Sequence, residues 1–276
     1  MSTDTRAYYV PVPDAEPGWE VFRPTSYCGG SWSPDLQHGA PPMGLLVRSL
    51  RRLWDTHADG KQAARLSFDF LGPIPMDEVR VRAATLRPGR RIDLSEAVME
   101  TRSGAWWRPV MVARAWRLAR TDTSSISRLP EPARVSAPDR GEAIDMTALW
   151  PGGFVRSVEV VRDARFDSVW VRPLVGLVAG EQTGALERVF GVADFSNAFG
   201  DAAEPDAWTF MNVEMTAHLL DVPRGEWFNI DAHSFVGRDG TGVTRATLSD
   251  ASGPAVLLTQ ELLLAGVERP APVSVR

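Results

Sequence analysis

The chain has 276 residues, of which 44% are hydrophobic and 24% charged, and its formal net charge at neutral pH is −5. This composition is typical of a folded globular protein and excludes a disordered or low-complexity chain, while the length exceeds the roughly 100–150 residues of one common domain. The lack of a basic excess argues against a nucleic-acid partner, because Lys and Arg supply most of the affinity for a phosphate backbone.

Cysteine and histidine are scarce. Cys28 is the single cysteine, and there are four histidines. One cysteine cannot form an internal disulfide or a Cys-rich metal site, and no two histidines have zinc-ligand spacing, so we expect neither a metal nor a cofactor. Residues 1–9 lack the apolar run of a signal peptide, and no run of 18 apolar residues occurs. The sequence therefore predicts a cytoplasmic protein without a membrane span.

Residues 121–153 divide the chain. They are rich in Ser, Pro and charged residues and show no sustained hydrophobic period, which is typical of a linker. We therefore expect an N-terminal unit over 1–120, a linker over 121–153, a C-terminal unit over 154–270, and a tail over 271–276.

The first unit is expected to contain one long helix followed by antiparallel strands. Apolar residues recur at helical spacing within 43–54. Gly- and Pro-containing turn signals then separate four strand-like runs. These runs are 64–71, 78–86, 92–101 and 110–118.

The second unit repeats this order. Two short strand-like runs, 157–161 and 167–173, precede a helix candidate at 183–195. Four further strand-like runs follow at 208–220, 227–236, 243–249 and 256–264. A long helix wrapped by a curled antiparallel sheet is the hotdog arrangement, and joining two such sheets edge to edge covers an open edge of each. The pattern predicts an α+β double hotdog in one polypeptide.

Gln260 interrupts an apolar stripe. In the predicted strand, Val256, Leu258, Leu262 and Leu264 share its face. A buried amide without hydrogen-bond partners costs about 1–3 kcal/mol, so this side chain requires a specific partner. The alternative is a structural glutamine satisfied within the core.

Two further polar residues are candidates for chemistry. Asp194 follows the second helical run and lies between Ala193 and Phe195, so it is a candidate base in an apolar environment; helix termination is the alternative. Asn212 lies within a predicted strand, where Asn is uncommon, and an edge or turn position is the alternative.

Several segments resemble acyl-CoA thioesterases of the thioesterase II type. They are ADFSN, FMNVEMTAHLLDVPRGEWFNIDAHS and TQELLL in the second unit, and QHGAPPMGLLVRSL and TLRPGRR in the first. The resemblance covers most of residues 20–265 apart from the linker. It implies a double-hotdog fold and hydrolysis of acyl-CoA without a metal or nucleotide cofactor. It also implies a site in which an Asp, a Thr or Ser, and a Gln orient the attacking water.

Under this resemblance, Asp194 and Gln260 match the Asp and the Gln, whereas Asn212 occupies the hydroxyl position. An amide both donates and accepts, so Asn212 can still hold a water. Altered substrate choice or weak activity is the other consequence expected from Asn in place of Thr or Ser. Thr216, four residues further on, is expected to share the strand face of Asn212 and is the alternative hydroxyl.

The first unit is expected to lack a second site. Its helical run 43–54 contains no acid, and the position equivalent to Gln260 falls near Arg114. His38 and Gly39, just before this run, are candidates to line the substrate channel or, alternatively, to form the helix entry. Arg87, Arg90 and Arg91 are candidates to meet a CoA phosphate, with a solvated hairpin turn as the alternative.

The resemblance thus predicts a fatty acyl-CoA thioesterase in which Asp194 anchors or activates a water that Asn212 and Gln260 position, and a helix N-terminus stabilises the oxyanion. An enoyl-CoA hydratase is one alternative, but it requires an Asp–His pair, and no His follows Asp194 closely. A catalytically silent acyl-CoA or lipid-binding protein is the other. The sequence leaves open the acyl chain length, whether the thioester is one of CoA or of a carrier protein, and whether the protein forms a homo-oligomer.

Overall fold

The computed structural model describes residues 6–13, 16–56, 59–130, 138, 141–202 and 207–267. The predicted tail and part of the predicted linker lie outside these ranges. The described helices are α1 (Ala40–Asp55), α2 (Met146–Leu149) and α3 (Ala185–Ala193), with short 3-10 helices η1 (Ser26–Cys28), η2 (Ser124–Ile126), η4 (Phe154–Ser157) and η5 (Asp194–Asn197). No helix in these ranges is long and apolar enough to cross a membrane.

The described strands belong to one curled sheet of fourteen strands, in the order β10-β1-β2-β4-β5-β6-β3-β11-β14-β13-β12-β9-β8-β7. Those before the linker are β1 (Ala7–Val12), β2 (Glu20–Pro24), β3 (Lys61–Phe70), β4 (Val79–Arg87), β5 (Ile92–Ser103) and β6 (Trp106–Ala119). The others are β7 (Glu142–Ala143), β8 (Val158–Arg162), β9 (Val169–Pro173), β10 (Gly176–Val178), β11 (Trp208–Leu219), β12 (Phe228–Val236), β13 (Thr241–Asp250) and β14 (Gly253–Gly266).

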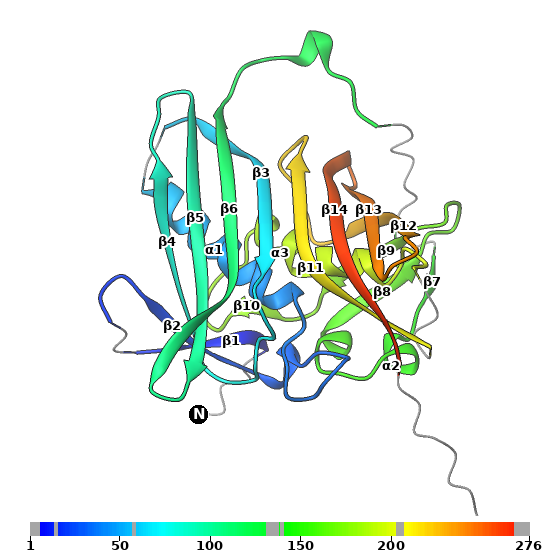
Figure 1. Cartoon of the computed structure of the whole chain (residues 1–276). Helices are drawn as coiled ribbons and strands as arrows, with labels where there is room; N and C mark the ends of the chain where they lie inside the picture. The colour runs from blue at the N-terminus through cyan, green and yellow to red at the C-terminus, as the bar shows by residue number, and fades with distance from the viewer. Residues whose placement is uncertain are drawn as a thin grey trace, which may run out of the picture.

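The two halves of the sheet meet where β3 pairs antiparallel with β11, with Phe68 opposite Met215 and Leu66 opposite Ala217. Figure 1 shows the strands of each half wrapped around the helix of that half, with α1 and α3 on the same side of the sheet. This is the expected α+β double hotdog with edge-joined sheets, and the predicted long helix and main strands are confirmed within a few residues at their ends. The division into two units and a linker stays a prediction.

Part of the predicted linker is packed against the protein. β7 pairs with β8 at an end of the sheet, through Glu142 opposite Arg162. In α2, Met146 is buried, and Asp145 caps the helix by accepting from the backbone N–H of Thr147. Trp150, the C-cap of α2, lines the pocket of the candidate functional site.

The helix α1 is buried on most sides because it packs both under its own sheet and against α3. Met43, Leu46, Val47 and Leu50 are fully buried, as their helical spacing predicts. At Gly44 the two helices come close, since a Cβ there would lie 3.3 Å from the carbonyl oxygen of Glu187. Only a residue without a side chain allows this contact without a shift.

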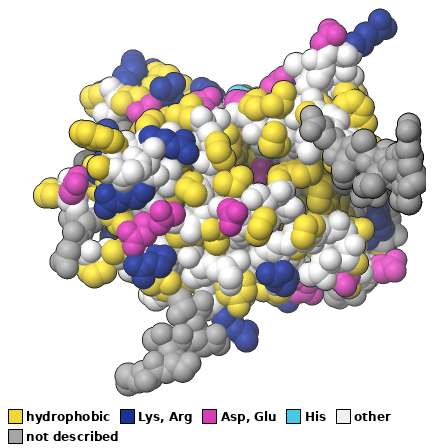
Figure 2. Space-filling view, turned by 60° about the horizontal axis from the view of Figure 1, so that its bottom comes forward, with side chains coloured by type: hydrophobic (Ala, Val, Ile, Leu, Met, Phe, Trp, Pro, Cys, Tyr) yellow, Lys and Arg dark blue, Asp and Glu magenta, His cyan; other side chains and the backbone are white. Residues whose placement is uncertain are grey.

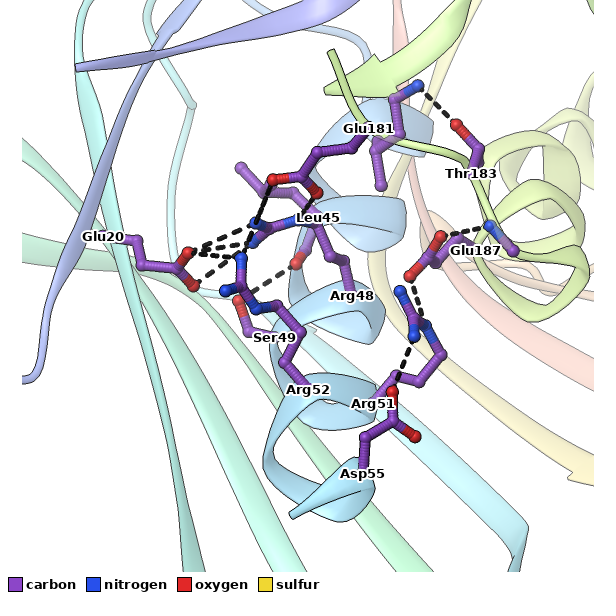
Figure 3. Close-up of polar contacts among 12 residues, drawn as sticks. Glu20, Leu45, Arg48, Ser49, Arg51, Arg52, Asp55, Glu181, Thr183 and Glu187 are labelled. Atoms are coloured by element: carbon purple, nitrogen blue, oxygen red, sulfur yellow. Dashed lines mark hydrogen bonds and ion pairs between the residues drawn. The ribbon is translucent and has the colours of Figure 1, made fainter. Parts of the chain in front are cut away.

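Ion pairs fasten α1 to the second half of the chain. Figure 3 shows the guanidinium of Arg48 between Glu20 and Glu181, and Arg51 bonded to Glu187. Arg48 is only 2% exposed, so leaving it unpaired would be costly. Arg48 and Arg51 lie on α1, whereas Glu181 and Glu187 lie in the second half. These pairs therefore help to fix where the N-terminus of α1 points.

Candidate functional site

A pocket of about 470 Å³ lies where the start of α1 meets the start of η5. Its lining includes Asp194, Asn212, His38 and Gly39. The view in Figure 2, from the lower end of the molecule in Figure 1, shows a hollow with hydrophobic side chains gathered around it. Four predicted residues from both halves of the chain therefore meet at one concave site, which is where binding and catalysis are expected. Gln260 is fully buried and is not among the lining residues.

Asp194 is held by the two predicted amides. It caps α3 and begins η5, and it is only 7% exposed. Its Oδ1 accepts from Asn212 Nδ2 at 2.5 Å and from Gln260 Nε2 at 3.4 Å. The amides of Asn212 on β11 and Gln260 on the adjacent strand β14 thus converge on the carboxylate of Asp194.

The oxygens of these amides lack donors among the described residues. Asn212 Oδ1 and Gln260 Oε1 are buried and have no hydrogen-bond partner within the described residues, and neither has Ser196 Oγ. Buried acceptors are almost always paired with protein or water. Because both amide nitrogens are directed to Asp194, both oxygens remain free to accept hydrogens from a bound molecule.

His38 contacts the same carboxylate from the other half of the chain. Its Nδ1 lies 3.2 Å from Asp194 Oδ2, and it also accepts from the backbone N–H of Ala40 at 3.2 Å. The imidazole stacks on Phe154, with ring centroids 4.1 Å apart. Burial lowers the pKa of His38, and the charge of Asp194 opposes that effect only in part, so the imidazole is neutral at neutral pH.

The sequence argued against an Asp–His pair because no His closely follows Asp194. The structure brings a His to Asp194 from the first half of the chain, where it precedes α1. The available sequence signals are a His just before the helix of one half and an Asp just after the helix of the other. Neither shows that the two meet until the packing of α1 against α3 is known.

Gly39 allows this close approach. A Cβ at Gly39 would lie 2.8 Å from Asp194 Oδ2 and 2.9 Å from Phe70 Cε1. Any other residue would push the start of α1 away from the carboxylate. Gly39 is also the N-cap of α1, so the helix-entry alternative is observed, and Gly39 lines the pocket. That it lines a substrate channel stays a prediction.

The N-terminus of α1 offers fewer backbone donors than expected. The N–H of Ala40 is bonded to His38, Pro41 and Pro42 have no N–H, and the N–H of Met43 bonds the carbonyl of Gly39. The helix therefore does not present a cluster of free N–H groups. The N–H of Gly39 itself has no acceptor among the described residues.

Thr216 does not share the strand face of Asn212. The register shifts between Asn212 and Glu214, so that Asn212 lies opposite Leu262 whereas Glu214 lies opposite Glu261. This β-bulge reverses the alternation of side chains. Thr216 consequently lies on the outer face and donates to the carboxylate of Glu214, away from the residues that line the pocket. The expectation is wrong because a period of two cannot anticipate an extra residue.

One wall of the pocket is aromatic. Trp32, Trp150 and Phe210 all line it and pack edge to face, with ring centroids 5.4–5.9 Å apart. Trp32 is 44% exposed. This wall gives the pocket an apolar surface beside the polar group formed by Asp194 and Asn212.

Other sequence candidates lie elsewhere. Arg87, at the end of β4, and Arg90 and Arg91, in the β4–β5 turn, are exposed. They lie at the end of the sheet opposite to the β5–β6 turn (Figure 1). Arg114, expected at the counterpart of Gln260, is exposed and pairs with Glu96. Within the described part of the chain, no group of three or more His, Cys, Asp or Glu side chains could hold a metal ion.

Comparisons with protein families match both halves of the chain. The family model described as acyl-CoA thioesterase N-terminal domain matches residues 29–118, and the one described as acyl-CoA thioesterase C-terminal domain matches residues 124–264. No curated protein matches the chain significantly.

Solved structures share the fold. A putative thioesterase from Novosphingobium aromaticivorans has a TM-score of 0.71 and 17% identity, over 94% of this chain and 99% of that one. A putative thioesterase II from Thermobifida fusca has a TM-score of 0.64 and 16% identity, over 96% and 97%. The acyl-CoA thioesterase II TesB2 from Mycobacterium marinum has a TM-score of 0.62 and 14% identity, over 92% and 96%.

Proposed function

Because the chain belongs to the acyl-CoA thioesterase family, whose N- and C-terminal domains it carries in tandem, we propose that it hydrolyses a fatty acyl-CoA thioester to the free acid and CoA. The observation that carries the proposal is the carboxylate of Asp194, held by two amides whose buried oxygens have no donor within the described residues. A water there can be oriented by the amides and deprotonated by the carboxylate.

In the proposed reaction, the oxygens of Asn212 and Gln260 accept hydrogen bonds from the water. As the water oxygen attacks the thioester carbonyl carbon, Asp194 removes its proton. The tetrahedral intermediate then collapses with cleavage of the C–S bond, and the thiolate leaves as CoA after taking up a proton. General-base catalysis of this kind contributes typically about 10²–10⁴-fold in rate.

The oxyanion requires a donor, and Gly39 is the best placed. Its backbone N–H has no acceptor among the described residues, and Gly39 lines the pocket next to Asp194 Oδ2. We assign the oxyanion contact to this N–H in place of the cluster of helix N–H groups that the sequence suggested. The aromatic wall of Trp32, Trp150 and Phe210 supports an apolar acyl group.

The test is thiol release from a panel of acyl-CoAs of increasing chain length, with the wild type and Asp194→Ala. The wild type is expected to release thiol from at least one substrate, and Asp194→Ala to be at least about 10²-fold slower. Asp231→Ala, at an exposed position on β12, is the matched control and keeps wild-type activity. Binding of acyl-CoA without turnover would instead establish a binding protein, and unchanged activity in Asp194→Ala would refute the site.

The His38–Asp194 pair favours a second candidate, an enoyl-CoA hydratase. In that reaction Asp194 deprotonates a water that adds to the β-carbon, and the proton is returned to the α-carbon through the pair of Asp194 and His38, whose Nδ1 lies 3.2 Å from Asp194 Oδ2. This activity consumes the enoyl absorbance without releasing thiol, so one substrate, an enoyl-CoA, distinguishes the two candidates.

A further inference from the structure

The guanidinium of Arg108 stands at the rim of the pocket. Arg108 lies on β6 opposite Thr101, which is fully buried. Residues directly opposite one another in adjacent strands point to the same face, so Arg108 belongs to the inner face of the sheet. Trp107, next to it, is on the other face, where it stacks with Arg80 and Arg102.

Arg108 lies beside a glycine that lines the pocket. A Cβ at Gly72 would lie 3.3 Å from Arg108 Nη1, and Gly72 lines the pocket. Gly72 is two residues beyond Phe70, whose Cε1 would lie 2.9 Å from a Cβ at Gly39. The cation therefore stands at the rim of the pocket and not at its centre.

Arg108 has no partner within the described part of the chain. Among the described residues it makes no hydrogen bond, ion pair or ring contact, whereas nearby arginines on the sheet are engaged: Arg114 pairs with Glu96, and Arg80 pairs with Glu100. Arg108 is also only partly exposed. A guanidinium in such a position is expected to have an anionic partner, because its planar fork matches phosphate and carboxylate.

The strand β3 lies between this cation and the aromatic wall. In the strand order β6-β3-β11, Arg108 stands on one side of β3 and Phe210 on the other. No Lys or Arg is among the described residues that line the pocket. An acyl group against the aromatic wall would therefore leave the thiol side of the substrate directed toward Arg108.

We propose that Arg108 binds the phosphate at the end of the pantetheine arm of the thioester substrate. This inference rests on the proposed thioesterase function and extends it to the part of the substrate that does not react. The phosphate occurs in two sources, the pyrophosphate of CoA and the phosphodiester of a phosphopantetheinyl carrier protein, and both present the same charged oxygens to a guanidinium.

The test compares Arg108→Gln with the wild type on two thioesters of the same acyl group, acyl-CoA and acyl-N-acetylcysteamine, which has no phosphate. Loss of a charge-assisted hydrogen bond predicts a KM for acyl-CoA raised about 10-fold or more, with an unchanged KM for the N-acetylcysteamine ester. Arg108→Lys is expected to be intermediate. Arg224→Gln, at an exposed arginine outside the pocket, is the matched control and keeps both KM values.

The outcomes separate the alternatives. An unchanged KM for acyl-CoA, or an equal rise for both esters, overturns the proposal. Selective loss of acyl groups that end in a carboxylate overturns it in favour of acyl recognition by Arg108. A larger effect on an acyl carrier protein than on acyl-CoA assigns the phosphate to the carrier.

Calorimetric titration of CoA into Asp194→Ala, with and without Arg108→Gln, reads the same contact without turnover. It therefore tests the contact of Arg108 with CoA even if the wild type releases no thiol. In that case the proposed function is refuted, and the titration alone decides whether Arg108 binds CoA. A Kd for CoA that Arg108→Gln leaves unchanged, with unaltered thermal unfolding, overturns the proposal.

Discussion

The imidazole Nδ1 of His38 lies 3.2 Å from Oδ2 of Asp194, and the two residues come from different halves of the chain. The contact depends on Gly39, which leaves space for the carboxylate, and on the ion pairs of Arg48 and Arg51 that hold α1 against the second half. The site is therefore a product of how the halves pack.

Gly39→Ala should disable the site with only modest loss of stability. The added Cβ would meet Asp194 Oδ2 at 2.8 Å, so α1 or the carboxylate must shift, and a displacement of about 1 Å can cost about 10²-fold in rate. We expect that loss in kcat/KM together with about 1–3 kcal/mol of destabilisation.

The control for that variant is Gly191→Ala in α3, where an added Cβ has no atom within 4 Å. It should be active and stabilised by about 0.5–1 kcal/mol. Thiol release and urea unfolding measure both variants. Full activity in Gly39→Ala would show that the spacing between α1 and Asp194 is not critical.

Gln260→Leu separates a functional from a structural glutamine. Gln260 is fully buried, its Oε1 has no partner within the described residues, and its bond to Asp194 is long at 3.4 Å. An apolar side chain of similar size should therefore change the free energy of unfolding little. Activity should fall at least about 10-fold because one water contact is lost. Met215→Leu, at the position opposite Gln260, controls for repacking. Destabilisation of Gln260→Leu by several kcal/mol, with activity per folded molecule retained, would support the structural role.

Asn212→Asp should move the pH dependence of the reaction. It replaces the amide nitrogen, 2.5 Å from Asp194 Oδ1, by a second carboxylate oxygen. Two carboxylates so close cannot both ionise easily, so one of their joint pKa values rises. The acidic limb of the kcat/KM profile should therefore move to higher pH. Asn212→Thr, which installs the hydroxyl that the family resemblance implies, should keep measurable activity without that shift.

The buried imidazole should make folding sensitive to acid. The pKa of His38 in the folded protein lies below its ordinary value of 6.5, so between the two values the unfolded chain binds the proton and the folded chain does not. Stability is then fully present above about pH 6.5 and falls as the pH falls below it. His38→Gln should remove this component. Urea unfolding at pH 8 and pH 5 tests it, and an equal difference between wild type and variant at both pH values would contradict it.

Trp32→Ala should alter acyl preference. Trp32 is 44% exposed and contacts Trp150 and Phe210, so its removal should affect the apolar wall more than the core. We expect KM for the preferred acyl-CoA to rise about 10-fold, consistent with 1–2 kcal/mol of lost apolar contact. Trp208→Ala, a comparably exposed Trp outside the pocket, should leave KM unchanged.

Sequence periodicity was sufficient for the fold because the helices and strands bury regular stripes. The apolar face of α1 and the alternating burial of β5 follow the expected periods, and the repeated order of elements predicts the two hotdog units. The convergence of Asp194, Asn212 and Gln260 was anticipated through the family resemblance, since strand periods place a residue on a face without saying what lies opposite.

Three parts of the site were beyond such reasoning. The contact of His38 with Asp194 depends on the packing of two helices, and the orientation of Thr216 depends on a bulge that reverses the alternation. Trp150 comes from a segment without hydrophobic period, which is ordered by its contacts with the rest of the protein. Each of these relationships is set by tertiary structure and not by local pattern.

The joining of β3 to β11 has a consequence for how this protein can vary. In a symmetric homodimer every substitution occurs in both subunits and so changes equivalent residues on both sides of each site. Here His38 and Gly39 are drawn from one half, and Asp194, Asn212 and Gln260 from the other, so a change in either half occurs once. The second half can therefore keep these polar residues while the first half varies its part of the pocket rim.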